Sequence, residues 1–255
     1  MTRIAGNSVI ASPCCQTSLT TLRYASMNFS AFEHWTDGRA VGGLMTQDGG
    51  LCKCTCGRYF LLSQTEEIGF LPNRKSRPPP NWDKVSLLTR VMGQAQAERQ
   101  RALEMYDTRP EAEIAAEEAV LPPAAIAVHD PELPEVIAQA QSDRAMLIVA
   151  RRRYWRYLND DFREAYREHK EVNAATPAPY RPTSLQRENM QQLILMLQDK
   201  PSPDWLEVAE LHRELGEPHK ALECLGYAGG KDQGMVRMHQ GLIAAGDQGP
   251  VRFRY

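Results

Sequence analysis

The hydrophobic pattern of this chain changes character near residue 70. Before that point, apolar residues come in short runs with β-branched or aromatic members, such as Thr21–Tyr24 and Tyr59–Leu62. Glycine-containing turns separate these runs, among them Asp37-Gly38 and Asp48-Gly49-Gly50. Short β-prone runs punctuated by turns are typical of small antiparallel sheets. The pattern therefore predicts a small β-rich module over residues 1–70.

From residue 82 onward the apolar residues recur at steps of three and four, which indicates helices with one apolar face. One such pattern covers residues 82–106, and a long one opens at Pro134 or Glu135 and reaches about Glu171. Thr183 then starts a further helix, with Gln186 three positions later completing a capping signal, and this helix should end near Lys200. The expected architecture is a larger all-α domain over residues 83–255, so the fold class is α+β.

A proline-rich segment separates the two predicted parts. Residues 71–82 contain three consecutive prolines, Pro78 to Pro80, preceded by a basic stretch that includes Arg74 and Arg77. Consecutive prolines favour an extended backbone and continue neither a helix nor a strand ladder. We predict a linker over residues 71–82.

The composition of the chain excludes some classes of protein but does not identify a function. The 255 residues carry a net charge of −2, with 42% hydrophobic and 24% charged residues. These values are ordinary for a globular protein, and they give no chain-wide positive field for nucleic acid. The sequence begins without a signal-peptide pattern and contains no apolar run long enough to span a bilayer. We expect a cytoplasmic protein, with no membrane among its partners.

The candidate chemistry lies in the cysteines. Five of the six fall in two short segments about forty positions apart, and in a reducing compartment such clusters indicate metal binding more than disulfides. The candidate metal ligands are Cys14, Cys15, Cys52, Cys54 and Cys56. The two segments resemble the paired knuckles of a zinc ribbon, and the resemblance implies a structural zinc ion.

The cysteine segments depart from the ribbon pattern in ways that leave three interpretations open. Ser12 stands where the first knuckle would begin, Gln16 replaces its glycine, and Lys53 occupies the first ligand position of the second knuckle. Structural zinc is the first interpretation, a degenerate ribbon that has lost its metal is the second, and a redox role is the third. Adjacent residues point to opposite sides of an extended chain, so Cys14 and Cys15 would need a turn to bind one ion. In contrast, Cys52, Cys54 and Cys56 are expected on one side of a strand, and His34 is a substitute ligand.

The C-terminal segment carries a second pattern. Trp205, Ala209 and Leu211 lead to Leu215-Gly216, and Ala221 follows on the next predicted helix. This segment resembles the turn of a tetratricopeptide (TPR) repeat, in which a helix ends in Leu-Gly and a small residue on the second helix packs against the first. Gly216 should adopt the left-handed conformation that ends a helix, Ala221 should be buried, and Arg213 should lie on the solvent side of the first helix. A weaker echo runs from Met235 to Gly246.

No phosphate loop, nucleophile elbow or metalloprotease motif is present in the sequence, so we do not expect an enzyme. The first functional hypothesis is a protein-binding module, acting as an adaptor or as an immunity (toxin-neutralising) protein on another protein. It draws on the TPR-like hairpin and on the aromatic residues between 27 and 35. The alternative is nucleic-acid binding through the ribbon and the basic-aromatic stretch Arg151–Tyr157. An amphipathic helix is the simpler explanation of that stretch, because Asp160, Asp161, Glu164 and Glu168 follow it and offset its charge, and nucleic acid is not the expected partner. The whole arrangement resembles uncharacterised bacterial proteins that carry a ribbon followed by helices.

Overall fold

The structure is a computed structural model of the whole chain. It describes residues 3–26, 31, 33–42, 50–72, 121–172, 179–228 and 233–253. Contacts divide the chain into two compact units, which are described separately. Unit 1 comprises Met1–Asn28 and Gln64–Ile126, and unit 2 comprises Phe29–Ser63 and Ala127–Tyr255.

Several of the predicted segments lie outside the described residues. They include the helix expected over residues 82–106 and all but two residues of the linker expected over 71–82. The same holds for residues 27–30 and 32 of the aromatic stretch. The proposed domain boundaries, residues 1–70 for the β module and 83–255 for the helical domain, therefore stay predictions. The α+β class is confirmed by small antiparallel sheets in the N-terminal region and helices in the C-terminal part.

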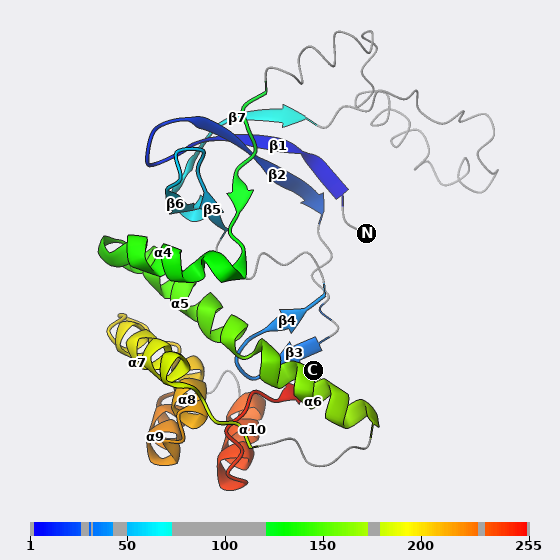
Figure 1. Cartoon of the computed structure of the whole chain (residues 1–255), viewed down its shortest axis with the longest axis vertical. Coiled ribbons are helices and arrows are strands. Elements are labelled where there is room, and N and C mark those ends of the chain that lie inside the picture. Colours follow the sequence, from blue (N-terminus) through cyan, green and yellow to red (C-terminus); the bar gives the residue numbers. More distant parts are fainter. Residues whose placement is uncertain are drawn as a thin grey trace, which may run out of the picture. The chain divides into compact units, whose positions relative to one another are not determined.

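Unit 1 is built on a three-stranded antiparallel sheet with the order β2-β1-β7 (Figure 1). The strands are β1 (Arg3–Ala11), β2 (Ser18–Ser26) and β7 (Glu66–Pro72). Bulges interrupt both ladders, one of them between Val9 and Ile10 opposite β7. A bulge bends the strand that carries it and strengthens the local twist of the sheet.

Unit 2 contains two further small sheets. In one, β3 (Glu33–Trp35) lies between β4 (Ala40–Val41) and β9 (Arg252–Phe253). In the other, β5 (Leu51–Lys53) pairs with β6 (Tyr59–Leu61), and β8 (Ile126–Ala127) completes the order β6-β5-β8. Short 3-10 turns follow β6 at Leu62–Gln64 and precede the helices at Asp130–Glu132.

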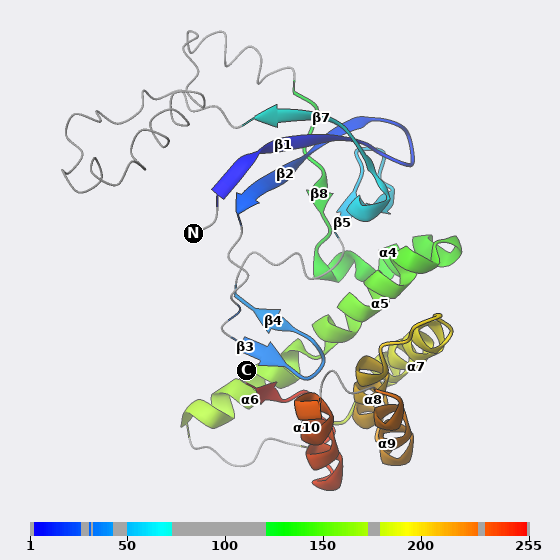
Figure 2. The ribbon, with the colours of Figure 1, turned by 180° about the vertical axis from the view of Figure 1, so that it is seen from behind.

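The helices of unit 2 follow in sequence order. Their bounds are α4 (Leu133–Gln139), α5 (Arg144–Leu158), α6 (Asp160–Val172), α7 (Ser184–Gln198), α8 (Trp205–Glu214), α9 (Pro218–Tyr227) and α10 (Gln233–Ala244). The β3–β4 hairpin lies beside α6 (Figure 2). There Arg167 bonds to Glu33, and the rings of Trp35 and Tyr166 meet edge to face. Among the helices that the structure describes, none has the length and apolar character needed to cross a bilayer.

The long helix expected from residue 134 to about 171 is present as three helices. Its two ends are right to within a few residues, but two interruptions were not predicted. The first is a 3-10 turn, Ala140–Ser142, after which the Asp143 side chain caps α5 by accepting from Met146 N at 3.0 Å. The second is at Asn159, whose backbone N–H donates to Arg156 O at 3.3 Å, three residues back, and so leaves the α-helical pattern.

The C-terminal hairpin is confirmed in both of its predicted details. Gly216, between α8 and α9, has φ +76°, and Glu217 N donates to His212 O at 2.9 Å to close the helix end. Ala221 is fully buried. The weaker echo repeats this geometry, since Gly246 has φ +70° and Asp247 N donates to Leu242 O. Thr183 and Gln186 likewise form the predicted capping box of α7.

Unit 2 has two apolar clusters that meet on α5. One gathers side chains from α5, α7, α8, α9 and α10, and the other gathers side chains from β5, β6, α4 and α5. Ile148 and Trp155 belong to the first cluster, and Met146 and Ala150 belong to the second. Helix α5 is therefore apolar on two sides, which leaves few of its residues in water.

Candidate functional site

The first cysteine pair lies in the turn between β1 and β2. Ser12 N donates to Thr17 O at 3.0 Å, and Gln16, with φ +58°, donates its N–H to Ser12 O at 2.9 Å. This turn brings the Cys14 and Cys15 Sγ atoms to 4.0 Å from each other. Two sulfurs bound tetrahedrally to one zinc ion at ~2.3 Å lie about 3.8 Å apart, so the turn gives the spacing that a shared ion needs. The expectation that these adjacent cysteines require a turn is confirmed.

Hydroxyl groups surround the first pair. The Ser12 Oγ atom is 2.9 Å from Cys14 Sγ, and Thr17 Oγ1 is 3.1 Å from Cys15 Sγ. Ser12 itself is completely buried. Ser12 therefore stands at the position where a ribbon would carry a ligand, and its hydroxyl is hydrogen-bonded to a sulfur of this pair.

The second pair lies in the turn between β5 and β6. Strand β5 ends at Lys53, and the turn closes where Gly57 N donates to Cys54 O at 2.9 Å. Gly57 has φ +86°, a conformation that favours glycine. The expectation that Cys52, Cys54 and Cys56 share one side of a strand is therefore wrong, because the chain leaves the strand before Cys54. Cys52 stays on β5 with a buried side chain, and burial raises its pKa.

Four of the five candidate ligands come together. The Sγ atoms of Cys14, Cys15, Cys54 and Cys56 all lie within 4.8 Å of one another, so these cysteines could hold a metal ion. Cys52 is not in this group of four. Neither is the substitute ligand His34, which lies on β3 with its ring 6.0 Å from that of Phe253. The donor set is four sulfur atoms, which suits a soft, tetrahedral ion such as zinc.

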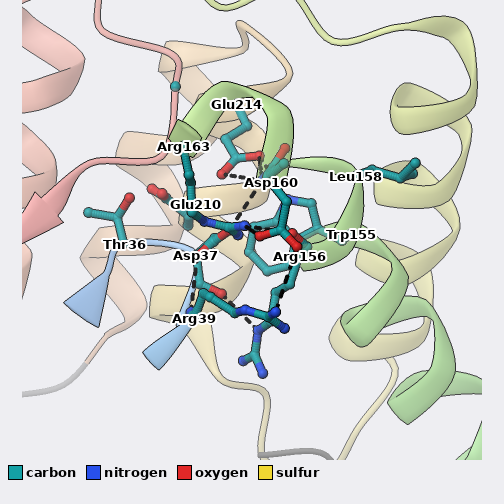
Figure 3. Close-up of polar contacts among 12 residues, drawn as sticks. Thr36, Asp37, Arg39, Trp155, Arg156, Leu158, Asp160, Arg163, Glu210 and Glu214 are labelled. Atoms are coloured by element: carbon teal, nitrogen blue, oxygen red, sulfur yellow. Dashed lines mark hydrogen bonds and ion pairs between the residues drawn. The ribbon is translucent and has the colours of Figure 1, made fainter. Parts of the chain in front are cut away.

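Unit 2 also contains a cluster of buried ionisable side chains that the sequence did not predict. Figure 3 shows four of them, Asp37, Arg163, Glu210 and Glu214. We call the whole group the ion cluster. It comprises six side chains, each at most 2% exposed: Asp37, Arg163, Glu210, Arg213, Glu214 and His239. They come from the β3–β4 turn, α6, α8 and α10. Burying a charge is costly unless it is paired and hydrogen-bonded, so the pairing of each group matters.

Asp37 and Arg163 form one end of the ion cluster. Arg163 Nη2 pairs with Asp37 Oδ2, while its Nη1 bonds to Asp160 and donates to Arg156 O at 2.8 Å. The Asn159 amide donates to Asp37 Oδ2 at 3.2 Å, and Arg156 Nε donates to the Asp37 carbonyl at 3.1 Å. A residue of the β3–β4 turn is thereby fixed to α5 and α6.

Glu214 occupies the middle of the ion cluster and has no cation within ion-pair distance among the described residues. Its Oε2 accepts from Trp155 Nε1 at 2.7 Å, from Asn159 Nδ2 at 3.0 Å and from Tyr180 Oη at 3.2 Å. Burial, followed by the charges of Glu210 and Asp37, raises the pKa of Glu214 to about 8. Glu214 therefore keeps its proton to a higher pH than an ordinary glutamate, which relieves the repulsion among three buried carboxyl groups.

Glu210, Arg213 and His239 form the other end of the ion cluster. Arg213 bonds to both carboxylate oxygens of Glu210, at 2.6 and 2.7 Å. Burial opposes ionisation, but Arg213 and His239 outweigh it and lower the pKa of Glu210 to about 2. His239 Nδ1 lies 2.8 Å from Met235 O, so that nitrogen carries a proton, and Nε2 lies 3.3 Å from Glu210. Despite its burial, the charge of Glu210 raises the pKa of His239.

Arg213 overturns one expectation about the hairpin. Its spacing on α8 predicts the solvent side, whereas its side chain is buried and also donates to Gly249 O at 2.8 Å. The reason is that every residue from Val208 to Glu214 is buried. This part of α8 has no solvent-exposed face, so periodicity could not place Arg213. The i, i+3 spacing of Glu210 and Arg213 was the one available signal.

The basic-aromatic stretch on α5 is engaged within unit 2. Arg152 binds Glu207 through two nitrogens, and Arg153 binds Asp130 at 2.6 Å. Arg151 donates to Asn189 Oδ1 at 3.2 Å. Tyr154 and Trp155 are buried. These contacts are those of an amphipathic helix, whose aromatic side chains pack in the core and whose arginines pair with neighbouring polar groups.

A groove of about 730 Å³ runs along α7, α8 and α9. Buried Ile194, Leu215 and Cys224 contribute to its lining. Two of its large apolar lining side chains are exposed, Leu195 of α7 at 61% and Tyr227 of α9 at 59%. The Tyr227 ring lies 5.0 Å from that of Trp205, at the start of α8. The groove therefore presents aromatic and aliphatic surface above an apolar floor.

Comparison of the chain with models of protein families, with curated proteins and with solved structures finds no match. The function must therefore be inferred from the molecule's own features: the α+β fold, the four-cysteine group, the ion cluster and the groove.

Proposed function

We propose that this chain is a non-enzymatic protein-binding module that acts as an adaptor or immunity protein in the cytoplasm. The observation that carries the proposal is the groove along α7, α8 and α9. Its exposed Leu195 and Tyr227 are two large apolar side chains from different helices on one lining. Aromatic and aliphatic anchors over a well-packed floor are the usual centre of a protein interface.

The ion cluster supports the same class of protein. Its carboxyl groups are bonded to arginine, amide, indole or hydroxyl donors within unit 2, and its position links the β3–β4 turn with α6, α8 and α10. Groups committed in this way hold helices in place. Such a framework keeps the groove rigid, and a rigid binding surface loses less entropy when a partner docks.

The proposal includes one structural zinc ion bound by thiolates. Its support is the group formed by Cys14, Cys15, Cys54 and Cys56, together with the turns that shape each pair. Purified protein should contain about one zinc ion per chain by elemental analysis. Cys54→Ser should lose most of it, whereas Cys224→Ser, a buried cysteine on α9, should retain it. Metal-free parent protein that is fully folded would favour the degenerate ribbon.

The alternative of nucleic-acid binding receives less support. Arg151, Arg152 and Arg153 are bonded to acceptors in unit 2, and the net charge of the chain is −2. A protein that binds phosphates loses affinity steeply as salt rises, because binding releases counterions.

The proposal is tested by capture from a native extract with the full chain as bait. The extract is treated with nuclease and washed at two salt concentrations. We expect one protein partner to be retained in stoichiometric amount, unaffected by nuclease. Recovery of nucleic acid alone, lost at the higher salt concentration, would instead support the alternative.

A further inference from the structure

The groove is bounded by helices, and this restricts what can bind in it. The backbone N–H and C=O groups of α7, α8 and α9 are bonded within their own helices, so the lining offers no open strand edge. A peptide cannot add to the groove as a strand and must be recognised through side chains. A helical segment satisfies its own backbone and presents apolar side chains along one stripe, as this surface requires.

The exposed anchors lie on two different helices of the groove, where one apolar stripe could contact both. Leu195 and Tyr227 project from two helices, and the apolar floor between those helices includes Ile194 and Leu215. A helix with apolar residues at i, i+3, i+4 and i+7 would reach the anchors and the floor together. Gln191 and Gln198 also line the groove and offer amide groups to the polar flanks of the same helix.

The charges of the groove indicate the sign of its partner. Glu217 is bonded to His212 at 2.7 Å and to Lys220 at 3.1 Å, so its charge is compensated. Glu223 also lines the groove and makes no ion pair with any residue that the structure describes. After burial, the charge of Glu223 is the second cause of the raised pKa of Cys224. The surplus charge in the groove is therefore one carboxylate.

We infer that the groove binds an amphipathic helix of a partner protein that carries a lysine or arginine beside its apolar stripe. This inference rests on the proposed protein-binding function and narrows the partner to one class. The apolar stripe supplies the affinity, and the basic residue pairs with Glu223 and fixes the register of the helix.

The test uses three fluorescent peptides of about 20 residues, long enough to form a helix. Two are amphipathic helices with the same leucine stripe, one with lysine and one with glutamate on the flank, and the third is proline-rich. Binding to the full chain is followed by anisotropy. At low ionic strength the lysine peptide should bind about two- to fivefold tighter than the glutamate peptide.

Matched variants locate the site. Leu195→Glu should weaken binding of the lysine peptide by at least about tenfold. Leu185→Glu should leave binding unchanged, because Leu185 is 49% exposed on the same helix but does not line the groove. Glu223→Lys should reverse the preference between the two charged peptides. Glu188→Lys, an exposed change on α7 outside the groove, should not.

Several results would overturn the inference. One is that the lysine peptide shows no saturable binding, and another is that the proline-rich peptide binds more tightly than the lysine peptide. The others are that Leu195→Glu and Leu185→Glu have equal effects, or that the parent protein binds the lysine and glutamate peptides equally well. A concentration-dependent dimer that Leu195→Glu abolishes would assign the groove to a second copy of the chain. The proposed function fails separately, when the parent protein captures no protein from the extract. If the parent protein captures a protein from the extract but binds none of the peptides, only the inference of a helical partner is rejected.

Discussion

Helix α8 has two sides that differ in almost every respect. One side carries Glu210, Arg213 and Glu214 into the ion cluster, where each is buried and bonded to side chains or carbonyls of unit 2. The other side contributes Trp205 and His212 to the groove, where Leu195 of α7 and Tyr227 of α9 are exposed. Interactions that are already complete stabilise a fold, whereas exposed apolar surface is available to a partner. The comparison assigns stability to the ion cluster and binding to the groove.

The largest expected effect is on the ion cluster side. Arg213→Ala leaves the Glu210 carboxylate buried without its main partner, so the free energy of unfolding should fall by roughly 3–5 kcal/mol. Chemical denaturation measures this change. Arg237→Ala is the matched control, because Arg237 is an exposed arginine on α10, and it should change stability by less than about 0.5 kcal/mol. Equal effects of the two variants would remove the distinction between the sides of α8.

A smaller effect comes from pH. The pKa of Glu214 is about 8 in the folded protein, above its unfolded value, so the folded state binds the proton more tightly. This contribution is complete at low pH and is lost as pH rises from about 4.5 towards 8, with a slope of at most about 1.4 kcal/mol per pH unit. His239, whose pKa is also raised, adds a loss of the same sign only above about pH 6.5.

The measurement is denaturation at several pH values between 5 and 8. In the parent protein, the free energy of unfolding should fall with rising pH already between pH 5 and 6.5, where His239 does not contribute. Glu214→Gln should flatten the curve in that range, because the amide cannot ionise. A parent curve that rises through this range would mean that Glu214 is ionised in the folded protein.

The smallest stability changes are expected at two glycines of the C-terminal hairpin, where substitution by alanine should have opposite effects. Gly216 has φ +76°, and a Cβ there would lie 3.0 Å from Gln248 Nε2, so Gly216→Ala should cost roughly 1 kcal/mol. Gly226 lies within α9 with open space around it, so Gly226→Ala should stabilise by roughly 0.5–1 kcal/mol. Thermal melts of the two variants should move in opposite directions. A shift in the same direction would show that one of these two backbone conformations is wrong.

Sequence reasoning succeeded where the signal is local. The turn that Cys14 and Cys15 need, the left-handed Gly216 and the capping box of Thr183 and Gln186 each depend on a few consecutive residues. Turn and cap chemistry acts over that distance, so these features could be predicted. The second cysteine turn was missed because Cys-x-Cys spacing fits a strand as well as a turn, and only the pairing of β5 with β6 decides between them.

The ion cluster could not be predicted from one sequence. Arg163 and Asp37 are 126 positions apart, and Asn159 and Asp37 are 122 apart. No periodicity links residues at such separations, and charged residues on a helix are ordinarily solvated. The groove was anticipated only as a hairpin, because α7, which contributes Leu195, lies outside the TPR-like pattern.

The central claim is that this protein works by binding another protein through the groove, and quantitative capture tests it most directly. Parent protein, Leu195→Glu and Leu185→Glu are immobilised at equal density and exposed to the same native extract. The free energies of unfolding of the three proteins should agree within about 0.5 kcal/mol, because both leucines are exposed. The account predicts one stoichiometric protein partner on the parent and on Leu185→Glu, and at least about tenfold less of it on Leu195→Glu. Equal recovery on all three surfaces would contradict it.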